Sequence, residues 1–236
     1  MRAVRLSFFQ MLAYMKRDMM LFAACLVPIL AGLLFRFAIP AAEAALTDWF
    51  QISAIISPCY ALIDIFFAML TPVVFCFVPA MISLEEADEK TAAYLFVTPL
   101  GKKGYLSARF GVPAVAAFLI TVILLPVFKL TALSPAAILL FAAGGTQQGM
   151  IVALLILTLS SNKLEGMAVT KLSTLMILGA VIPFFIKDNL QYALLLFPSF
   201  WIGKAACENI LIYMIPAFAL SAIWIYFLLK RYLRKM

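Results

Sequence analysis

The sequence contains no histidine, and only 12% of its 236 residues are charged. Histidine is the usual general base near neutral pH and the commonest metal ligand, so its absence removes the usual group for both roles. The sequence also lacks a Gly-rich phosphate loop ending in Gly-Lys-Ser or Gly-Lys-Thr, so the chain alone is not expected to hydrolyse ATP. We therefore expect no catalytic residue, no metal site and no cofactor bound by this chain.

The cysteines are few and lack the spacing of metal ligands. Cys25, Cys59, Cys76 and Cys207 lie in or beside apolar segments. This placement predicts small buried side chains rather than a metal site or a disulfide framework.

Hydrophobic residues are the abundant class, at 66% of the chain, with a mean hydropathy of +1.10. Water-soluble globular proteins have far fewer, so the composition indicates an integral membrane protein. A membrane-spanning helix needs about 20 apolar residues, and this length therefore holds about six spans and no sizeable soluble domain. The net charge of +7 comes from Lys and Arg at the ends of apolar runs, so we expect a lipid bilayer and no nucleic acid as partner.

The predicted fold is an all-α membrane protein with six transmembrane helices in one domain, residues 1–236. Residues 1–18 have amphipathic spacing and predict an elbow helix in the membrane interface. Pro40 is expected to end the first span. Residues 187–209 are apolar but interrupted by Pro198, which predicts a re-entrant outer segment before the last span. The predicted spans are 19–39, 58–83, 110–128, 134–159, 167–186 and 210–229.

The distribution of basic residues predicts the orientation. Fourteen of the 18 Lys and Arg residues lie on the side that holds the two termini, the loop after the second span and the turn after the fourth. By the positive-inside rule, both termini are expected in the cytoplasm of a multi-pass protein of the bacterial cytoplasmic membrane.

The loop of residues 84–109 is the most charged part of the chain. Four acidic residues between Glu85 and Glu89 precede an apolar run from Ala92 to Val97, which is followed by a Thr-Pro turn and a basic return to the membrane. So apolar a run is unusual in a loop that is exposed to water. The pattern therefore favours a short helix that binds a partner surface.

This stretch resembles the cytoplasmic signature of ABC-2 type permeases, in which a Glu-rich patch is followed by Gly-Thr, an apolar helix, Thr-Pro and a basic return. Lys90 stands where that family commonly has glycine. The six spans, the elbow and the interrupted outer segment are also similar to the family. The matching residues are Glu86, Thr91, Thr98, Pro99, Tyr105 and Arg109.

The resemblance implies the membrane-spanning subunit of an ATP-driven exporter. Its implied partners are two copies of an ABC ATPase subunit, which would carry ATP and Mg, and a second permease chain, either an identical copy or a paralogue. The segment from Glu86 to Leu100 would form a coupling helix seated on the ATPase. The implied coupling residues are Glu85, Glu86, Thr91, Ala92, Tyr94, Leu95, Thr98 and Pro99, and the outer gate candidates are Pro198 and Trp201.

Four polar residues inside the spans are candidates for lining an export cavity, namely Asp64, Gln147, Gln148 and Lys171. Each has a structural alternative. Asp64 could be capped by a neighbour, Lys171 could extend its amine to the surface, and the glutamines lie within a Gly145-xxx-Gly149 spacing that permits close helix packing.

The sequence favours export of a hydrophobic or amphipathic cargo, such as a peptide toxin, an antimicrobial compound or a lipid-like molecule. Two alternatives from other classes remain. One is a non-transporting membrane scaffold or assembly factor, and the other is an ion-coupled carrier in which Asp64 binds the ion.

Overall fold

The long apolar stretches of the sequence form long helices. The computed structural model describes residues 2–235 and contains helices and no strand within them. Six of the helical segments are long and apolar enough to cross a membrane, which confirms the predicted fold class. Their bounds are Met19–Phe50, Ser57–Asp88, Gly101–Phe128, Pro135–Leu159, Lys163–Phe185 and Leu211–Lys235.

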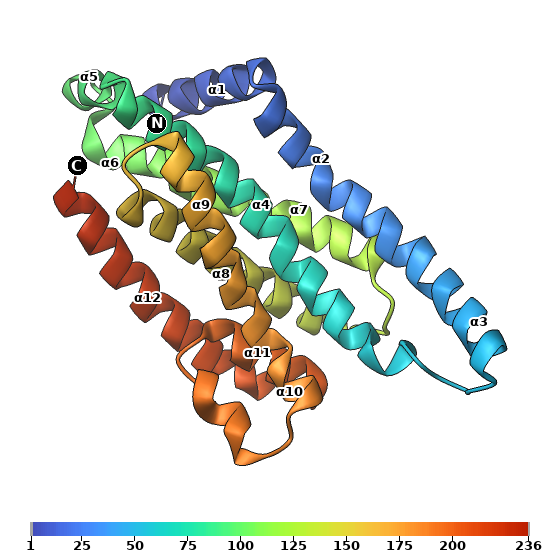
Figure 1. The fold of residues 1–236 in the computed structure, drawn as a ribbon. Helices are drawn as coiled ribbons and strands as arrows, with labels where there is room; N and C mark the ends of the chain where they lie inside the picture. Colours follow the sequence, from blue (N-terminus) through green and yellow to red (C-terminus); the bar gives the residue numbers. More distant parts are fainter. Residues whose placement is uncertain (1, 236) are drawn as a thin grey trace.

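The N-terminal helix α1 (Arg2–Arg17) lies across one end of the bundle and meets α2 (Met19–Leu33) at an angle (Figure 1). Asp18 separates the two helices, and its Oδ1 accepts hydrogen bonds from the backbone N–H groups of Met20 and Leu21 at 3.0 and 3.2 Å. This cap fixes where α2 begins. The side chains of Arg2, Lys16 and Arg17, which the elbow prediction included, lie outside the described part of the structure.

The prediction that the first helix ends near Pro40 is wrong. After α2 the chain passes through a π-helical turn (Leu34–Ala38) into α3 (Ile39–Phe50) without a break. Pro40 lies in the first turn of α3, directly after the π turn. Proline is tolerated in a first turn, and the wider π turn already interrupts the usual hydrogen-bond pattern there.

The loop between α3 and α4 (Tyr60–Asp88) is held by one carboxylate. Glu43 accepts hydrogen bonds from the backbone N–H groups of Ile55, Ile56 and Ser57, at 3.1, 2.6 and 3.3 Å. Residues 41–57 are therefore mostly helix, followed by a tightly bound loop.

The centre of the bundle is the crossing of α4 and α8 (Pro135–Leu159), the two most buried of the long helices. Two glycines of α8 make the approach possible. A Cβ at Gly145 would lie 2.1 Å from the carbonyl oxygen of Ala68, and one at Gly149 would lie 2.7 Å from that of Pro72. The small-residue spacing therefore brings two backbones into contact, as the packing interpretation predicted.

The remaining helices surround this crossing (Figure 1). The third long helix begins at Gly101 rather than near residue 110, and the sixth continues past residue 229. The third long helix consists of α6 (Gly101–Leu106), a π turn (Ser107–Gly111) and α7 (Val112–Phe128). The fifth consists of α9 (Lys163–Thr174), a 3-10 helix (Leu175–Ala180) and α10 (Ile182–Phe185), and the sixth consists of a 3-10 turn (Leu211–Tyr213) and α12 (Met214–Lys235). The short helix α5 (Thr91–Val97) lies between α4 and α6 in the sequence.

The segment before the last span folds back into the bundle. It contains a 3-10 helix (Asn189–Leu194) and α11 (Pro198–Cys207), most of which is buried. A Cβ at Gly203 would lie 2.3 Å from the carbonyl oxygen of Ala180, so α11 packs directly on the backbone of the fifth long helix. This packing agrees with a re-entrant rather than a spanning element.

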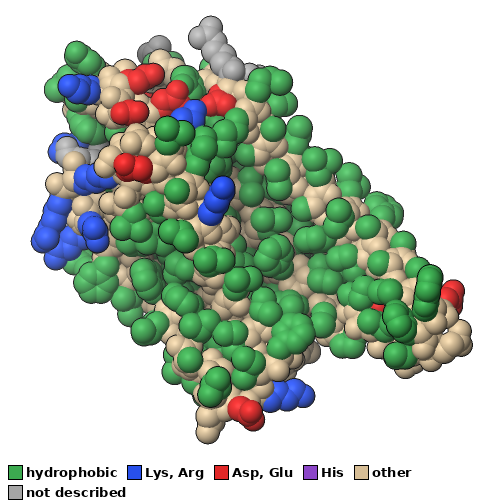
Figure 2. All heavy atoms as spheres, viewed as in Figure 1, with side chains coloured by type: hydrophobic (Ala, Val, Ile, Leu, Met, Phe, Trp, Pro, Cys, Tyr) green, Lys and Arg blue, Asp and Glu red, His purple; other side chains and the backbone are tan. Residues whose placement is uncertain are grey.

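The surface of the molecule is divided into a hydrophobic middle and charged ends. Figure 2 shows a wide hydrophobic region between two ends where charged side chains gather. The end with the most charges contains α5 and the C-terminal ends of α4 and α12 (Figures 1 and 2). Such a belt matches the hydrocarbon layer of a bilayer, about 30 Å thick.

We predict that Gly145→Ala lowers the thermal unfolding temperature of the purified chain in detergent. The added methyl has no space beside the Ala68 carbonyl, and overpacking of this kind costs about 1 to 3 kcal/mol. Gly111→Ala is the matched control, because the nearest atom to its Cβ would be the Ser107 Oγ at 3.6 Å. Equal unfolding temperatures for the two variants would contradict the close crossing.

Candidate functional site

The short helix α5 stands at the end of the bundle where α4 stops, and its own residues set its limits. Lys90, just before it, has a φ of 60°, in the left-handed region that glycine adopts most easily. This explains the position of glycine in the pattern that the loop resembles. The Thr91 hydroxyl donates to the Glu86 carbonyl at 3.1 Å, and the Thr98 hydroxyl donates to the Leu95 carbonyl at 2.7 Å before Pro99 ends the helix.

The two faces of α5 differ sharply. Ala92 is buried against the bundle, and the Phe96 ring meets the Tyr105 ring edge-on at a centroid distance of 5.2 Å. Tyr94 is 73% exposed and Val97 is 85% exposed. An exposed tyrosine and valine on a short helix outside the apolar belt form a small apolar contact surface, which we call the α5 face.

A largely buried ion pair joins the end of α4, just before α5, to the third long helix. The Arg109 Nε donates to a Glu86 carboxylate oxygen at 3.0 Å, and its Nη2 pairs with the other oxygen. The remaining Nη1 donates to the Ser7 carbonyl of α1 at 3.1 Å, while the Tyr105 hydroxyl donates to Glu86 at 2.8 Å. Three elements therefore meet at one guanidinium, whose planar fork matches the carboxylate in a way that lysine cannot.

A second charged group ties α1 and α9 to the end of α4. The Lys163 Nζ lies 2.8 Å from an Asp18 oxygen and 3.0 Å from a Glu85 oxygen. The hydrogen bond from Lys163 lowers the pKa of the Asp18 carboxyl below its ordinary 3.8. The Tyr14 hydroxyl donates to Glu85, and this bond raises the pKa of Tyr14 to about 12. The elbow helix is thus held by ionic contacts as well as by its apolar face.

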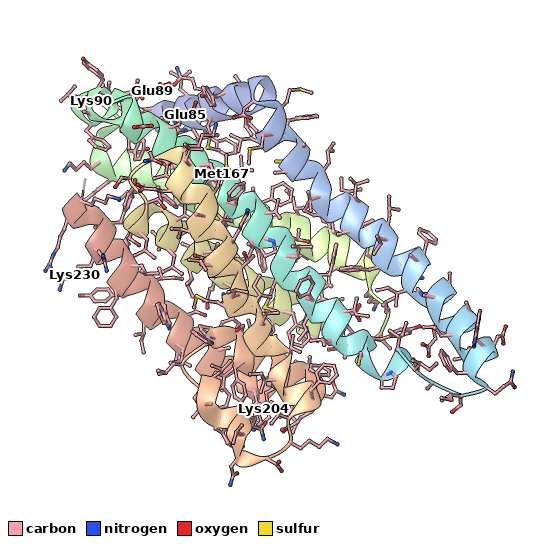
Figure 3. All side chains as sticks on the ribbon, viewed as in Figure 1. Glu85, Glu89, Lys90, Met167, Lys204 and Lys230 are labelled. Atoms are coloured by element: carbon pink, nitrogen blue, oxygen red, sulfur yellow. The ribbon has the colours of Figure 1, made fainter. Side chains whose placement is uncertain are left out.

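An acidic hollow of about 340 Å³ lies between α1 and α5. Glu85, Glu86 and Glu89 contribute to its wall together with Tyr94 and Thr91. Figure 3 shows Glu85, Glu89 and Lys90 at this end of the bundle. Five of the predicted coupling residues therefore line one hollow, namely Glu85, Glu86, Thr91, Tyr94 and Leu95. Ala92 instead faces the bundle, and Thr98 and Pro99 do not line the hollow.

The two glutamines of α8 lie in the middle of the bundle. Gln148 is fully buried, and neither its Nε2 nor its Oε1 has a hydrogen-bond partner among the described residues. The Oε1 of Gln147 is buried without a described partner as well. Unpaired amides at this depth are costly, and they would gain partners if water or cargo entered beside α8.

Asp64 is only 2% exposed, and a loop binds its carboxylate. Its oxygens accept hydrogen bonds from the backbone N–H groups of Leu130 and Thr131, at 2.7 and 2.8 Å, and from the Thr131 hydroxyl. The structure thus agrees with a capped residue in this conformation. The side chain of Lys171 is exposed on the outer face of α9, and its assignment to a cavity stays a prediction.

The two gate candidates belong to α11. Pro198 begins this helix and is buried, and the Trp201 Nε1 donates to the Leu195 carbonyl at 3.0 Å. Beside them, the Lys204 Nζ donates to the Tyr192 hydroxyl at 2.9 Å, which raises the pKa of Lys204. Lys204 was not among the predicted site residues, because its aromatic neighbours Tyr192 and Tyr213 lie 12 positions before it and nine after it in the sequence.

Within residues 2–235, no group of three or more Cys, Asp or Glu side chains could hold a metal ion. At the end of α4, Glu85 pairs with Lys163 and Glu86 pairs with Arg109.

A family model matches residues 11–229, nearly the whole chain. Its description reads "Rv2686c-like: Fluoroquinolones export permease protein Rv2686c-like". No curated protein and no solved structure matches the chain.

We predict that Arg109→Lys destabilises the protein by about 1 to 3 kcal/mol, the cost of the hydrogen bonds that are left unmade. Lysine keeps the charge but cannot bind both Glu86 oxygens and the Ser7 carbonyl together. Denaturant unfolding measures the effect, with Lys103→Arg, an exposed conservative exchange nearby, as the control. A cost below about 0.5 kcal/mol, typical of surface exchanges, would show that the pair is not structural.

The Asp18 carboxyl predicts a pH dependence. Because its pKa is lowered in the folded state, its stabilising effect is present above about pH 4 and is lost as the pH falls through the lowered value. Asp18→Asn keeps a cap for α2 and removes the charge. Wild type should be more stable than this variant at neutral pH, by less than about 1 kcal/mol for so accessible a pair, and equal to it near pH 2. A difference that does not change with pH would refute the assignment.

Proposed function

The chain belongs to the Rv2686c-like family of fluoroquinolones export permease proteins, and on this basis we propose that it is the membrane-spanning subunit of an ATP-driven ABC exporter of the ABC-2 type. The observation that carries the proposal is the α5 face. Tyr94 and Val97 are the exposed apolar side chains of a short helix that buried contacts hold firmly in place. A partner protein at this end of the bundle would cover them.

The partner is an ABC ATPase. Two ATPase copies and a second permease chain, identical or paralogous, complete the transporter. ATP and Mg bind to the ATPase subunits, and this chain holds no cofactor. It is not an enzyme by itself, because its charged groups serve as structural contacts.

The contacts around α5 could transmit a force from α5 through α4 to α8. Glu86 lies in α4, and its pairing with Arg109 ties α4 to the third long helix. The backbone of α4 touches that of α8 at Gly145 and Gly149. A push on α5 by the closing ATPases would therefore move α4 and its neighbours as rigid bodies between two packings. Cargo drives such a change only if its affinity differs between the two packings.

The cargo is a hydrophobic or amphipathic molecule. The family description names export of fluoroquinolones, which are antimicrobial compounds. The peptide toxins and lipid-like molecules named above are the other candidates. The unpaired amides of Gln147 and Gln148 are the polar groups best placed to meet cargo inside the bundle, with Lys171 and Asp64 as further candidates and Pro198 and Trp201 at the outer gate.

The end that carries α5 faces the cytoplasm in this proposal, with both termini on the same side of a bacterial cytoplasmic membrane. The positive-inside distribution of the 18 basic residues supports this orientation. The gathering of charged side chains at the same end agrees with it (Figure 2).

Placing a charge on the α5 face tests the proposal. Tyr94→Asp and Val97→Asp should each reduce co-purification of the ATPase at least tenfold and abolish ATP-driven efflux of a fluoroquinolone from cells. Both side chains are exposed, so the thermal stability of the chain alone should not change. A carboxylate buried in an apolar contact without a partner costs far more than the contact supplies.

Ile52→Asp is the matched control, because Ile52 is an exposed apolar residue in the loop after α3, at the opposite end of the bundle. It should leave ATPase binding and efflux unchanged. Normal ATPase binding by both α5 variants would refute the docking assignment. Absence of any ATPase from the wild-type complex would refute the exporter itself.

A further inference from the structure

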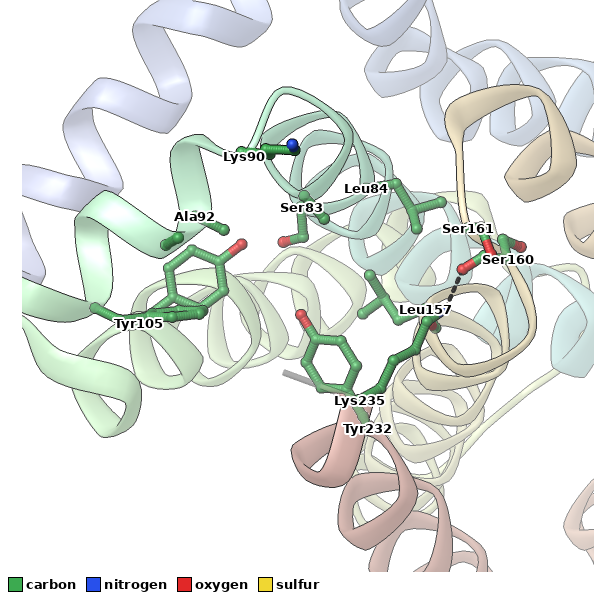
Figure 4. Close-up of a pocket in the computed structure, with 13 residues that line it drawn as sticks. Ser83, Leu84, Lys90, Ala92, Tyr105, Leu157, Ser160, Ser161, Tyr232 and Lys235 are labelled. Atoms are coloured by element: carbon green, nitrogen blue, oxygen red, sulfur yellow. Dashed lines mark hydrogen bonds between the residues drawn. The ribbon is translucent and has the colours of Figure 1, made fainter.

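A space on the other side of α5 is lined by cations and hydroxyl groups. It has a volume of about 300 Å³ and lies between α5, the end of α4, the turn after α8 and the end of α12 (Figure 4). Lys90 and Lys235 supply positive charge, and no Asp or Glu side chain lines the space. The rest of its polar lining consists of Ser83, Ser160, Ser161, Tyr105 and Tyr232.

Two of the hydroxyl groups lack partners. Ser83 is 1% exposed and Ser160 is fully buried, and neither Oγ has a hydrogen-bond partner among the described residues. Figure 4 shows the hydroxyls of Ser83 and Tyr232 turned toward the same space, whereas the Tyr105 hydroxyl already donates its proton to Glu86. Buried hydroxyls are almost always paired, so this cluster indicates an acceptor that binds there.

The cations have unused donors as well. The Lys235 Nζ donates to the Leu157 carbonyl at 3.1 Å and to the Ser160 carbonyl, which uses two of its three protons. No described residue accepts a hydrogen bond from the Lys90 ammonium. Glu86, which accepts from the Tyr105 hydroxyl, is already neutralised by Arg109. The space is therefore electrostatically positive and rich in donors.

We propose that this space binds the phosphate group of an anionic membrane lipid. Phosphate oxygens are acceptors for both ammonium and hydroxyl donors. The α4, α8 and α12 helices all end beside the space, which places it at the surface of the bilayer, where lipid headgroups lie. Leu84, Leu157 and Phe96 add apolar walls that suit the glycerol part of a lipid rather than a free ion.

The bound headgroup would connect α5 to α12, because the two helices form opposite walls. The site is independent of the export function, since it requires only this chain and a membrane. It can therefore be tested without the ATPase or the cargo.

The test uses the purified full-length chain, delipidated in mild detergent, with phosphatidylglycerol, phosphatidylcholine or inorganic phosphate added. Lipid retention by native mass spectrometry and the unfolding temperature are the readouts. The double variant Ser83→Ala/Lys90→Gly should lower the affinity for phosphatidylglycerol at least tenfold, as expected for the loss of a charge-assisted and a neutral hydrogen bond. Neither change weakens the unliganded fold, because Ser83 loses an unpaired hydroxyl and glycine relieves the left-handed backbone at residue 90.

Lys230→Gln is the matched control, because Lys230 is an exposed cation of α12 that does not line the space (Figure 3). It should bind phosphatidylglycerol as wild type does, and phosphatidylcholine should stabilise none of the proteins. Equal binding of phosphatidylglycerol by wild type and the double variant would overturn the site. An equal loss of affinity in Lys230→Gln would show that phosphatidylglycerol is held only by general electrostatic attraction to the surface, which would also overturn the site. If inorganic phosphate alone raised the unfolding temperature as much as phosphatidylglycerol does, the proposal that the bound phosphate belongs to a lipid would be overturned.

Discussion

The ion pair between Glu86 and Arg109 is the constraint on which the charged end of the molecule depends. Removing both charges from water is costly, and the pair offsets that cost only because Nε, Nη1 and Nη2 of the guanidinium each donate a hydrogen bond. One of the Glu86 oxygens also accepts a hydrogen bond from the Tyr105 hydroxyl. The pair joins α4 to the third long helix and, through the Ser7 carbonyl, to α1, next to the start of α5.

A coupling element requires a firm attachment of this kind to the rest of the molecule. The α5 helix has seven residues and would not be stable alone, so its orientation comes from the contacts of Ala92 and Phe96 with the bundle. The same contacts leave Tyr94 and Val97 facing outward. In the N-terminal half of α4, the close backbone contact with α8 prevents the two helices from moving independently. In the proposed mechanism, force applied at α5 would pass through this contact toward Gln147 and Gln148, whose buried amide oxygens have no hydrogen-bond partner among the described residues.

The sequence was sufficient to predict the features that depend on composition and local pattern. Six apolar runs of spanning length became six long helices, and the apolar run after Thr91 became α5. Features set by distant residues could not be read in this way. The capping of Asp64 by Thr131, the role of Lys163 between α1 and α4, and the aromatic surroundings of Lys204 each join residues that only the fold brings together.

Local rules failed in two instructive places. Pro40 was expected to end a helix, yet a π turn before it allows the helix to continue to Phe50. Lys90 departs from the glycine of the pattern that it resembles and nevertheless takes a glycine-like backbone conformation. This backbone strain is of the order of 1 kcal/mol, and Lys90 contributes to the wall of the space under α5.

The most direct test of the central claim is site-specific photo-crosslinking in intact membranes. A photoreactive amino acid at position 94 should capture the ABC ATPase, because Tyr94 is the side chain that α5 presents outward, and the same amino acid at position 52 should not. Capture of the ATPase at position 94 alone is the result that the account predicts. Failure to capture it at position 94, with an ATPase present in the same membranes, would contradict the account.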